Sequence, residues 1–450
     1  GKSVAVIGLG ASGAAAARLA LAKGGDVYVS DSSPDSSTAA RAAELRAAGA
    51  AVELGGHDLD RVARAGIIVV SPGVPPDAPV LRGLAARGVS WISEPELAVR
   101  FYAGPLIAIT GTNGKTTTTL LVAHLLRAAG IRAEAGGNVG GGLAPTASDL
   151  ALAVPPPDWY VLEMSSFQLA GVESLRADIG VVTNLSPDHL DRYADVQAYF
   201  ADKARLFGNA DEESKWVLPV GDAAVEELAA DAPGNRYYFG GDPESPSHAL
   251  VERGLLSLRV SGASEPLVPV DDLPLLGRHN VANALAAALT ARLAGGEPEG
   301  IAAGLRSARP LPHRMEPVGE RGGALWVNDS KATNVAATRS ALASLDRPVV
   351  ILLGGKDKGE DFGSLAAALR GRVRHALAYG AAGPRIEKEL RGVVPIELME
   401  TDFEAVVERA AKLARPGDLV LLSPACSSFD MFDSYEHRGR RFAELAQEGA

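Results

Sequence analysis

One short stretch limits the fold of this chain more than any other: an apolar run at residues 107–109 that leads into a glycine-rich loop and then into a helical pattern. The loop reads Thr110-Gly111-Thr112-Asn113-Gly114-Lys115-Thr116-Thr117. Its glycines let backbone N–H groups and the start of the next helix face an anion, while Lys115 can reach terminal phosphates and Thr116 can bind Mg²⁺. A standard P-loop has a further glycine where this chain has Ile109, so the loop is a shortened variant. The stretch predicts an α/β sheet that binds ATP.

The first hundred residues have the pattern of a dinucleotide-binding fold. An apolar strand at residues 4–7 precedes Gly8-Leu9-Gly10-Ala11-Ser12-Gly13, an alanine-rich helix follows, and a second strand ends at Asp31. Further strands are expected at residues 67–70 and near residues 89–92. The glycine motif places a phosphate at a helix N-terminus, and Asp31 can bind ribose hydroxyls, but the motif does not separate NAD from a UDP-sugar. We assign residues 1–103 to this domain.

The second predicted domain, residues 104–310, carries polar residues at its strand ends. Strands at residues 159–163 and 179–184 run toward the same sheet edge as the ATP loop. We therefore expect these side chains to gather near Lys115: Glu163, Ser165, Ser166, Asn184, Asp188 and His189. Thr116 and Glu163 are suitable Mg²⁺ ligands, whereas His189 could bind a metal or orient a substrate. Lys203, in an expected helix at residues 196–207, is an ordinary solvated lysine on sequence chemistry alone.

The third predicted domain, residues 311–450, again alternates strands and helices. Strands are expected at residues 325–327, 349–353, 376–379 and 419–422. Polar loops at residues 328–334, 354–358 and 423–428 follow three of them, so one rim of one sheet should carry all three loops. That rim is a candidate binding site, although ordinary solvated loops would have a similar composition.

Composition limits the remaining classes of function. The net charge is −11 with both signs interspersed, so there is no basic face for nucleic acid. The single cysteine, Cys426, excludes an intrachain disulfide and a cysteine-rich metal site, and it fits a reducing compartment. No apolar run reaches membrane-spanning length, and a strand begins already at residue 4. We expect a cytoplasmic protein that binds small molecules, without nucleic-acid or membrane partners, and a monomer.

Six motifs in order and spacing make the chain resemble the Mur ligases over nearly its whole length. The motifs are the ATP loop, Glu163-Met164-Ser165-Ser166-Phe167-Gln168-Leu169, Asp188-His189-Leu190-Asp191-Arg192, Gly277-Arg278-His279-Asn280-Val281-Ala282-Asn283, Pro312-His313-Arg314-Met315-Glu316 and Asn328-Asp329-Ser330-Lys331-Ala332-Thr333-Asn334. The resemblance implies an α/β protein of three domains: a Rossmann-like domain, a central P-loop ATPase-like domain and a second Rossmann-like domain. The opening glycine motif, with Ser423-Pro424-Ala425-Cys426-Ser427-Ser428 and Glu436-His437-Arg438-Gly439, resembles the members that add D-glutamate.

What the resemblance implies is an ATP-dependent amide ligase of peptidoglycan precursor synthesis, which joins D-glutamate to UDP-N-acetylmuramoyl-L-alanine through an acyl phosphate. Catalysis would rest on Lys115, Glu163, His189 and Lys203. Two Mg²⁺ ions would be held by Thr116, Glu163, His189 and a carbamylated Lys203, which reverses the ordinary reading of that lysine. The other implied ATP contacts are Gly111, Thr112, Asn113, Gly114, Thr117, Asn280, Asn283, Arg314 and Asp329. The implied UDP-substrate contacts are Ala11, Ser12, Asp31, Ser32, Gly73, Asn138 and His189. D-glutamate would be held by Lys331, Thr333, Lys358, Ser428 and Tyr435.

Three alternatives remain open from the sequence. The nearest is another Mur-type or folylpolyglutamate-type ligase with the same ATP core and a different acceptor. The opening glycine motif argues against the folate enzyme and against ligases that add diamino acids. A second is an NAD-dependent oxidoreductase fused to an ATPase, and only the glycine motif at residues 8–13 supports it. The third is a nucleotide-gated regulatory module without turnover.

Overall fold

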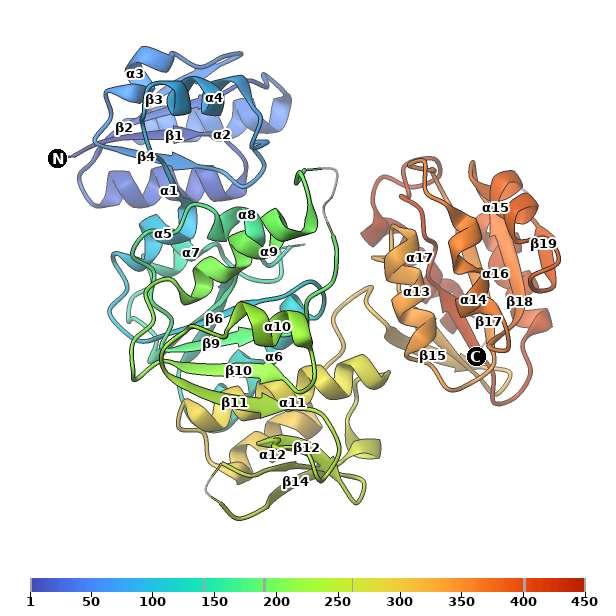
Figure 1. Cartoon of the computed structure of the whole chain (residues 1–450). Helices are drawn as coiled ribbons and strands as arrows, with labels where there is room; N and C mark the ends of the chain where they lie inside the picture. Colours follow the sequence, from blue (N-terminus) through green and yellow to red (C-terminus); the bar gives the residue numbers. More distant parts are fainter. Residues whose placement is uncertain (1, 141, 189–191, 261, 400–401, 449–450) are drawn as a thin grey trace. The chain divides into compact units, whose positions relative to one another are not determined.

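The computed structural model describes residues 2–140, 142–188, 192–260, 262–399 and 402–448. Within these ranges the chain forms three sheets, drawn in Figure 1, and is a mixed α/β protein rich in parallel strands, as predicted. The chain divides into two compact units. The first holds Gly1–Asp272 and Ala282–Arg306, and the second holds Leu273–Val281 and Ser307–Ala450.

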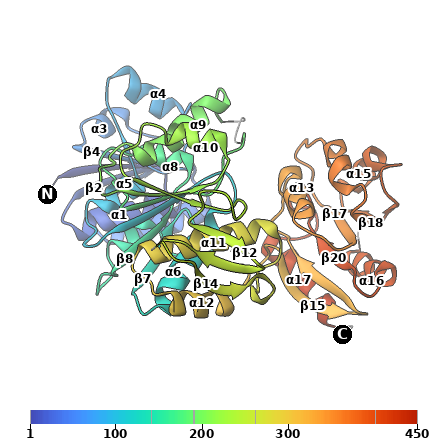
Figure 2. The same cartoon turned by 60° about the horizontal axis from the view of Figure 1, so that its bottom comes forward.

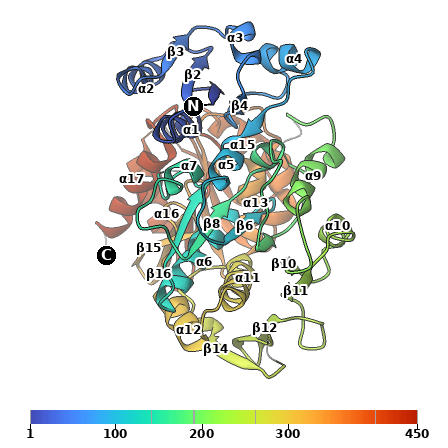
Figure 3. The same ribbon diagram turned by 90° about the vertical axis from the view of Figure 1, so that its left-hand side faces the viewer.

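The first sheet has the strand order β3-β2-β1-β4-β5, with all neighbours parallel, and α2, α3 and α4 are seen around it in Figure 3. Gly13 packs so tightly that a Cβ there would lie 1.9 Å from the carbonyl oxygen of Gly8, which explains the glycine motif. The predicted strand near residues 89–92 is shorter and later than expected. The elements are β1 (Ser3–Ile7), α1 (Ala11–Ala22), β2 (Asp26–Asp31), α2 (Ser36–Ala47), β3 (Ala51–Leu54), α3 (Leu59–Ala63), β4 (Ile67–Val70), α4 (Pro79–Ala86), β5 (Ile92–Ser93) and α5 (Glu94–Val99).

The second sheet carries the ATP loop at the end of β6, an interior strand that lies between β9 and β8. Its order is β14-β13-β12-β11-β10-β9-β6-β8-β7, parallel from β7 to β12 and antiparallel from β12 to β14. The strands are β6 (Leu106–Thr110), β7 (Ala133–Gly137), β8 (Trp159–Glu163), β9 (Ile179–Val182), β10 (Lys215–Pro219), β11 (Asn235–Phe239), β12 (Ala249–Glu252), β13 (Leu255–Leu258) and β14 (Glu265–Pro269).

Two glycines of helix α12 allow it to pack closely on α6, and both helices lie beside the second sheet in Figure 2. A Cβ at Gly300 would lie 2.5 Å from Ala129 Cα, and one at Gly304 would lie 2.7 Å from a methyl of Leu125. The helices that accompany this sheet are α6 (Lys115–Ala128), α7 (Ala147–Leu150), α8 (Ser166–Leu169), α9 (Val196–Ala204), η1 (Arg205–Phe207), α10 (Ala223–Leu228), η2 (Val270–Asp272), α11 (Arg278–Leu293) and α12 (Pro298–Ser307).

The third sheet has the order β15-β16-β20-β17-β18-β19, and only the β15–β16 pair is antiparallel among its described strands. Residues 349–353 are apolar throughout because β17 is buried on both faces. The elements are β15 (Glu316–Arg321), β16 (Ala324–Asn328), α13 (Val335–Ala343), β17 (Val349–Gly354), η3 (Phe362–Leu365), α14 (Ala366–Leu369), β18 (Val373–Tyr379), α15 (Gly383–Leu390), β19 (Ile396–Leu398), α16 (Phe403–Leu413), β20 (Leu419–Leu422) and α17 (Tyr435–Gln447). Among the described residues we find no helix whose length and hydropathy would let it span a membrane.

A buried carboxylate ties the end of the first domain to the central sheet. Glu96 of α5 is fully buried, and its Oε2 accepts the backbone N–H groups of Glu173, Ser174 and Leu175 at 3.1, 3.0 and 2.9 Å. Its Oε1 accepts Arg100 Nε at 3.0 Å. One side chain therefore accepts hydrogen bonds from three successive backbone amides in the segment before β9.

Replacing Glu96 by alanine should lower the free energy of unfolding by about 3–5 kcal/mol, because three amides and a guanidinium lose their acceptor. Denaturant titration measures the change. Glu173→Ala is the matched control: its carboxylate is 52% exposed and pairs with the same Arg100 at the surface, so the expected change is below about 1 kcal/mol. Equal losses in the two variants would contradict the role given to Glu96.

A second acid of the same helix makes stability depend on pH. Glu94 is fully buried, its Oε1 accepts the N–H of Ser148, and its Oε2 has no hydrogen-bond partner among the described residues. Burial raises the pKa of Glu94 from 4.5 to about 7. Since the folded chain holds this proton more tightly than the unfolded chain, the contribution is fully present below pH 4.5 and is lost as pH rises through about 7.

Glu94→Gln should remove that dependence, because glutamine keeps an oxygen for Ser148 and cannot ionise. Between about pH 4.5 and 7 the wild-type chain should lose up to about 3 kcal/mol of stability relative to the variant. Unfolding free energies at a series of pH values measure the difference. Parallel pH curves for the two proteins would show that Glu94 is not the titrating group.

Candidate active site

The ATP loop has the backbone shape that its glycines predicted. β6 ends at Thr110, and α6 begins at Lys115 after Gly114, whose φ is +83°. Gly111 has a φ of +140°, and a Cβ there would lie 2.0 Å from Thr183 Oγ1. No other residue fits at this point without displacing Thr183. The loop therefore places the start of α6 at the edge of the sheet. The first amides of a helix have no intrahelical partners, so they can bind an anion there.

Lys115 lies folded along this loop. Its Nζ donates to the carbonyl oxygens of Gly111 at 3.0 Å and Thr112 at 2.8 Å. An ammonium held by neutral carbonyls can transfer to phosphate oxygens, which are stronger acceptors. Lys115, the predicted phosphate contact, therefore already lies at the loop where the phosphates are expected to bind.

Lys203 is buried, so the reading of it as a solvated lysine is wrong. Its side chain is 1% exposed, and its Nζ donates to the Gly111 carbonyl at 2.8 Å and to Thr110 Oγ1 at 3.3 Å. Burial, together with the charge of Lys115, lowers the pKa of Lys203 from 10.5 to about 7. The helix α9 thus brings a second lysine to the same carbonyl as Lys115, with a large neutral fraction near neutral pH.

Glu163 has the arrangement expected of a metal ligand. It ends β8 and is 2% exposed, and its Oε1 accepts Asn138 Nδ2 at 3.2 Å. Its Oε2 is buried without a hydrogen-bond partner among the described residues, which is costly unless a cation is bound. Glu163 therefore suits Mg²⁺, and Thr116, the other expected ligand, is buried in the first turn of α6. His189 lies outside the described residues, and within them we find no cluster of three or more His, Cys, Asp or Glu able to hold a metal.

A cavity of about 280 Å³ joins these groups to the first domain. One wall is built on Phe167, which stacks on Tyr193 at a centroid distance of 5.5 Å and carries the guanidinium of Arg192 at 4.2 Å on its ring. The lining confirms that Ser165 and Ser166 approach Lys115, as the strand ends predicted. The lining residues are Pro72, Gly73, Lys115, Asn138, Ser165, Ser166, Phe167, Tyr199 and Lys203.

Tyr199 is a site residue that the sequence analysis missed. Its hydroxyl lies 3.3 Å from Thr112 Oγ1 of the ATP loop, and Lys203 Nζ lies 4.8 Å from its ring centroid. Tyr199 and Lys203 are four residues apart on α9, so they share one helix face. That spacing was the available signal, since an aromatic residue and a lysine on one face, in a helix next to an ATP loop, suggest a buried pair.

The predicted UDP-substrate positions of the first domain surround the end of β1. Asp31 accepts the N–H groups of Leu9 at 2.5 Å and Ser33 at 2.7 Å, so its carboxylate also fixes the glycine-rich loop. The remaining positions are distributed as follows: Ala11 and Ser12 begin α1, Ser32 follows β2, and Gly73 lines the cavity.

The predicted asparagines of α11 belong to different compact units. Asn283, in the first unit, lies against the ATP loop: Thr118 Oγ1 is 3.4 Å from its Oδ1, and a Cβ on Gly114 would lie 2.3 Å from that oxygen. Asn280, in the second unit, donates to the Leu276 carbonyl at 2.7 Å.

In the second unit, Asp329 is buried at the end of β16. Its carboxylate accepts Ser423 Oγ at 2.8 Å and the Met315 N–H at 3.2 Å, and burial raises its pKa from 3.8 to about 7. These bonds join Asp329 to the ends of two other segments of this unit. The neighbouring Arg314 lies in the loop before β15, where its backbone N–H donates to the Leu311 carbonyl at 3.1 Å.

Two of the residues predicted to bind the amino acid, Lys331 and Tyr435, lie next to each other. Lys331 Nζ lies 4.1 Å from the ring centroid of Tyr435, and burial together with the charge of Arg314 lowers the pKa of Lys331. The charge of Lys358 also lowers this pKa, whereas the charge of Glu436 raises it. Thr333 donates its N–H to the Lys331 carbonyl at 2.8 Å, whereas Ser428 is buried in the loop after β20.

Arg438, a second residue that the sequence analysis gave no role, joins the three polar loops of this sheet. It is fully buried, and its guanidinium donates to the carbonyls of Ser330, Gly354, Cys426 and Ser427 at 2.9–3.4 Å and to Ser330 Oγ at 2.9 Å. The loops after β16, β17 and β20 therefore lie together, which confirms that one rim carries them.

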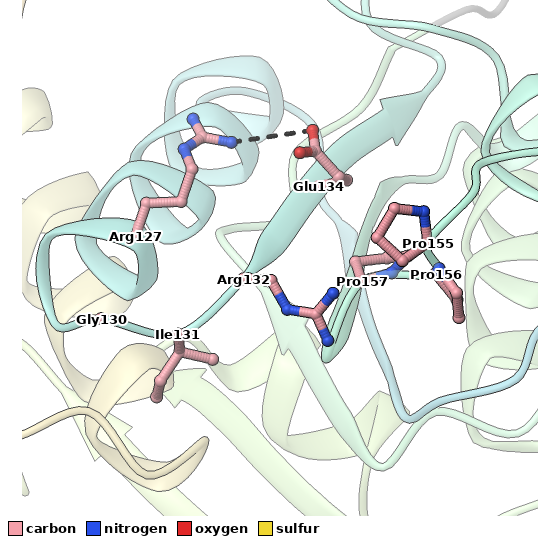
Figure 4. A pocket seen from close by; sticks show the side chains of 8 residues that line it. All are labelled: Arg127, Gly130, Ile131, Arg132, Glu134, Pro155, Pro156 and Pro157. Carbon is pink, nitrogen blue, oxygen red and sulfur yellow. Dashed lines mark ion pairs between the residues drawn. The ribbon is translucent and has the colours of Figure 1, made fainter.

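Another hollow of the first unit, about 370 Å³ in volume, is shown in Figure 4. Its charged side chains are already paired: Arg127 with Glu134 at 3.9 Å, the dashed line in Figure 4, and Arg132 with Asp158 at 2.5 Å. The cavity beside Lys115 is the better candidate for chemistry, because Lys115 and Lys203 line it and Asn138 of its lining donates to Glu163.

Three family models match the chain. They are described as Mur ligase MurD-like, N-terminal domain, over residues 2–93; Mur ligase middle domain, over residues 109–291; and Mur ligase, glutamate ligase domain, over residues 313–426.

Curated relatives match over the full length. A UDP-N-acetylmuramoylalanine--D-glutamate ligase of Acidobacterium capsulatum is 41% identical over 447 residues, 99% of this chain and 96% of the relative. One of Anaeromyxobacter dehalogenans is 42% identical over 461 residues, 100% of this chain and 98% of the relative. Among solved structures, the UDP-N-acetylmuramate-alanine ligase MurC of Thermotoga maritima shares the fold, with 19% identity, a TM-score of 0.60 and full coverage of both chains. The MurF ligase of the same organism in complex with ADP has 14% identity and a TM-score of 0.61, and the match covers 94% of this chain and 95% of that one.

Proposed function

Because the chain belongs to the Mur ligase family, we propose that it is an ATP-dependent ligase that adds D-glutamate to UDP-N-acetylmuramoyl-L-alanine in peptidoglycan precursor synthesis. The observation that carries the proposal is full-length identity of 40–42% to relatives named for this reaction. The cavity beside the ATP loop supplies the local support, since two lysines line it and its Asn138 donates to the carboxylate of Glu163.

Three domains divide the work in this proposal: residues 1–103 bind the uridine nucleotide, residues 104–310 bind ATP, and residues 311–450 bind the amino acid. The division is supported by the three sheets and by family-model matches that fall within these ranges. In the first domain the proposed UDP contacts are Ala11, Ser12, Asp31, Ser32 and Gly73, with Asn138 and His189 contributed by the central domain.

The first chemical step activates the muramoyl-alanine carboxylate. One of its oxygens attacks the γ-phosphorus of ATP, and the bond from that phosphorus to the ADP oxygen breaks. Lys115 leaves the loop carbonyls and neutralises charge on the transferring oxygens, aided by the first amides of α6. The remaining nucleotide contacts in the proposal are the loop residues 111–117, Asn280, Asn283, Arg314 and Asp329.

The second step forms the amide. The D-glutamate amine attacks the acyl phosphate carbonyl, the bond from that carbon to the phosphate oxygen breaks, and the departing phosphate takes up the proton that the amine loses. Lys331 and Lys358 supply positive charge for the two carboxylates of the amino acid. Thr333, Ser428 and Tyr435 complete the proposed acceptor site.

Mg²⁺ fits the donor set of the first unit, and two ions are part of the proposal. Thr116, the unsatisfied oxygen of Glu163 and His189 would hold them, together with a carbamate on Lys203. Bound there, the metal neutralises phosphate charge. The carbamate is supported by the burial of Lys203 and by its pKa near 7, which leaves much of the amine neutral and able to add CO₂.

We further propose that the enzyme works as a monomer in the cytoplasm on small molecules, without nucleic-acid or membrane partners. An interspersed charge distribution with a net charge of −11 supports this view.

The decisive experiment measures ADP formation with UDP-N-acetylmuramoyl-L-alanine and four acceptors: D-glutamate, L-glutamate, L-alanine and diaminopimelate. Turnover is expected with D-glutamate alone. Preference for another acceptor would replace the proposal with a different Mur-type or folylpolyglutamate-type ligase. ADP release without acceptor or UDP-sugar would favour a regulatory ATPase, and NADH binding would revive the oxidoreductase alternative.

A further inference from the structure

The residues that follow β9 hold the ATP loop from one side. The carboxamide of Asn184 pairs with both backbone polar groups of Asn113: its Oδ1 accepts the N–H at 3.0 Å, and its Nδ2 donates to the carbonyl at 3.0 Å. Thr183 Oγ1 donates to the same carbonyl at 2.6 Å. A carboxamide has one acceptor and one donor side. The Asn184 side chain therefore makes the two hydrogen bonds to Asn113 that the backbone of a neighbouring strand would otherwise make.

These contacts extend the sheet beyond its strands. β6 and β9 pair in parallel up to Thr110 and Val182, and the next bonds continue from Thr183 N–H to the Thr110 carbonyl at 3.0 Å. The Thr112 N–H then donates to the Asn184 carbonyl at 2.9 Å. The segment after β9 thus follows the loop residue by residue until Asn113.

The two hydrogen bonds that the Asn113 carbonyl accepts fix the direction of the next amide. The peptide group between Asn113 and Gly114 is planar and trans, so its N–H points opposite to its C=O. Because Thr183 and Asn184 hold that carbonyl toward their own segment, the Gly114 N–H must point away from it. This is the first amide of the series that continues into α6, where anions bind at helix starts.

The contribution of these bonds to folding is small, which separates the role from simple stabilisation. Both bonds between Asn113 and Asn184 are exposed to solvent, and the register of β6 on β9 is already set by buried strand residues. Loss of the carboxamide would therefore free one peptide group to rotate while leaving the sheet intact.

We propose that Asn184, with Thr183, is a positioning residue that aims the Gly114 amide at the nucleotide phosphates. The proposal rests on the ATP site of the proposed function and adds to it a group that touches no substrate. It follows that the pair acts on nucleotide affinity and phosphoryl transfer, and leaves the binding of the UDP-sugar unchanged.

The test is calorimetric titration of the full-length protein with AMP-PNP and Mg²⁺, in the absence of any acceptor. Asn184→Ala should weaken binding about tenfold, since two hydrogen bonds that orient the loop are lost. Asn184→Asp should weaken it further, because a carboxylate oxygen would face the Asn113 carbonyl. Thr183→Val keeps the shape of the side chain, and about a fivefold loss is expected. In turnover, KM for ATP should rise in all three variants while KM for the UDP-sugar stays within about twofold.

Asn209→Ala is the matched control. Asn209 also donates to two backbone carbonyls of the first unit, Glu173 at 2.9 Å and Leu175 at 3.0 Å, but in a loop remote in sequence from the ATP site. Its AMP-PNP affinity should equal that of the wild type. Unchanged affinity in Asn184→Ala, or an equal loss in Asn209→Ala, would overturn the proposal. Normal AMP-PNP binding by a wild-type protein that fails to join D-glutamate would instead count against the proposed function.

Discussion

Replacing Lys115 by alanine should lower kcat/KM for ADP formation by roughly 10²–10³-fold, the loss typical when a charge-stabilising donor is removed from a reaction centre. Lys115 Nζ is the donor that the loop itself holds, on the Gly111 and Thr112 carbonyls at 3.0 and 2.8 Å. Alanine leaves the backbone amides in place. We therefore expect AMP-PNP binding to weaken less than kcat falls, because charge on the transferring oxygens is greatest in the transition state. Initial rates of ADP release and AMP-PNP titration measure the two effects.

Lys215→Ala provides the matched control for Lys115. Lys215 also donates its Nζ to a backbone carbonyl of the first unit, that of Leu293 at 3.1 Å, and it begins β10, away from the ATP loop. The control should keep wild-type kcat. Turnover by Lys115→Ala within about tenfold of the wild type would contradict the phosphoryl-transfer role, and a matching loss in Lys215→Ala would point to a general effect of removing a lysine.

Strand ends were the part of this molecule that sequence could predict well. Buried strands are recognisable as short apolar runs, and in parallel sheets their polar ends share one edge. Ser165 lines the cavity beside Lys115 for this reason, and Glu163 contacts it through Asn138, which also lines it. The antiparallel strands β12 to β14 were missed because they are short and partly polar, so their period is weak.

Burial of charged side chains on helices was the part that sequence chemistry alone did not predict. Arg438 and Lys203 are ordinary surface residues by type, yet both are almost fully buried. For Arg438 a signal existed in α17, where Phe442 and Leu445 lie on the same helix face. The sequence shows which face is buried, but it does not show which carbonyls a buried guanidinium will meet, since those come from loops far apart in the chain.

A carbamate on Lys203 would make activity depend on CO₂, a property that no other role of this lysine explains. The neutral amine adds to CO₂ and releases one proton, which converts a buried cation into an anionic oxygen ligand. Carbamate formation is favoured by a pKa of about 7 and by 1% exposure, because a neutral amine is the reactive form and burial protects the product from water. Activity of the wild-type protein should therefore fall in CO₂-depleted buffer and return on addition of bicarbonate.

Lys203→Ala should lower kcat by about 10²-fold or more, since both the proposed metal ligand and a bond to the Gly111 carbonyl are lost. The cavity left behind lies next to the Tyr199 ring and has room for a small carboxylate. Millimolar formate or acetate should therefore restore part of the activity, because their oxygens replace those of the carbamate. The same salts should not restore the activity of Lys115→Ala, because that variant has lost a cation, which a carboxylate does not replace. Full activity in Lys203→Ala would remove the residue from the mechanism. A severe loss that no carboxylate repairs, in a variant with unchanged unfolding temperature, would favour the free ammonium over the carbamate as the working form.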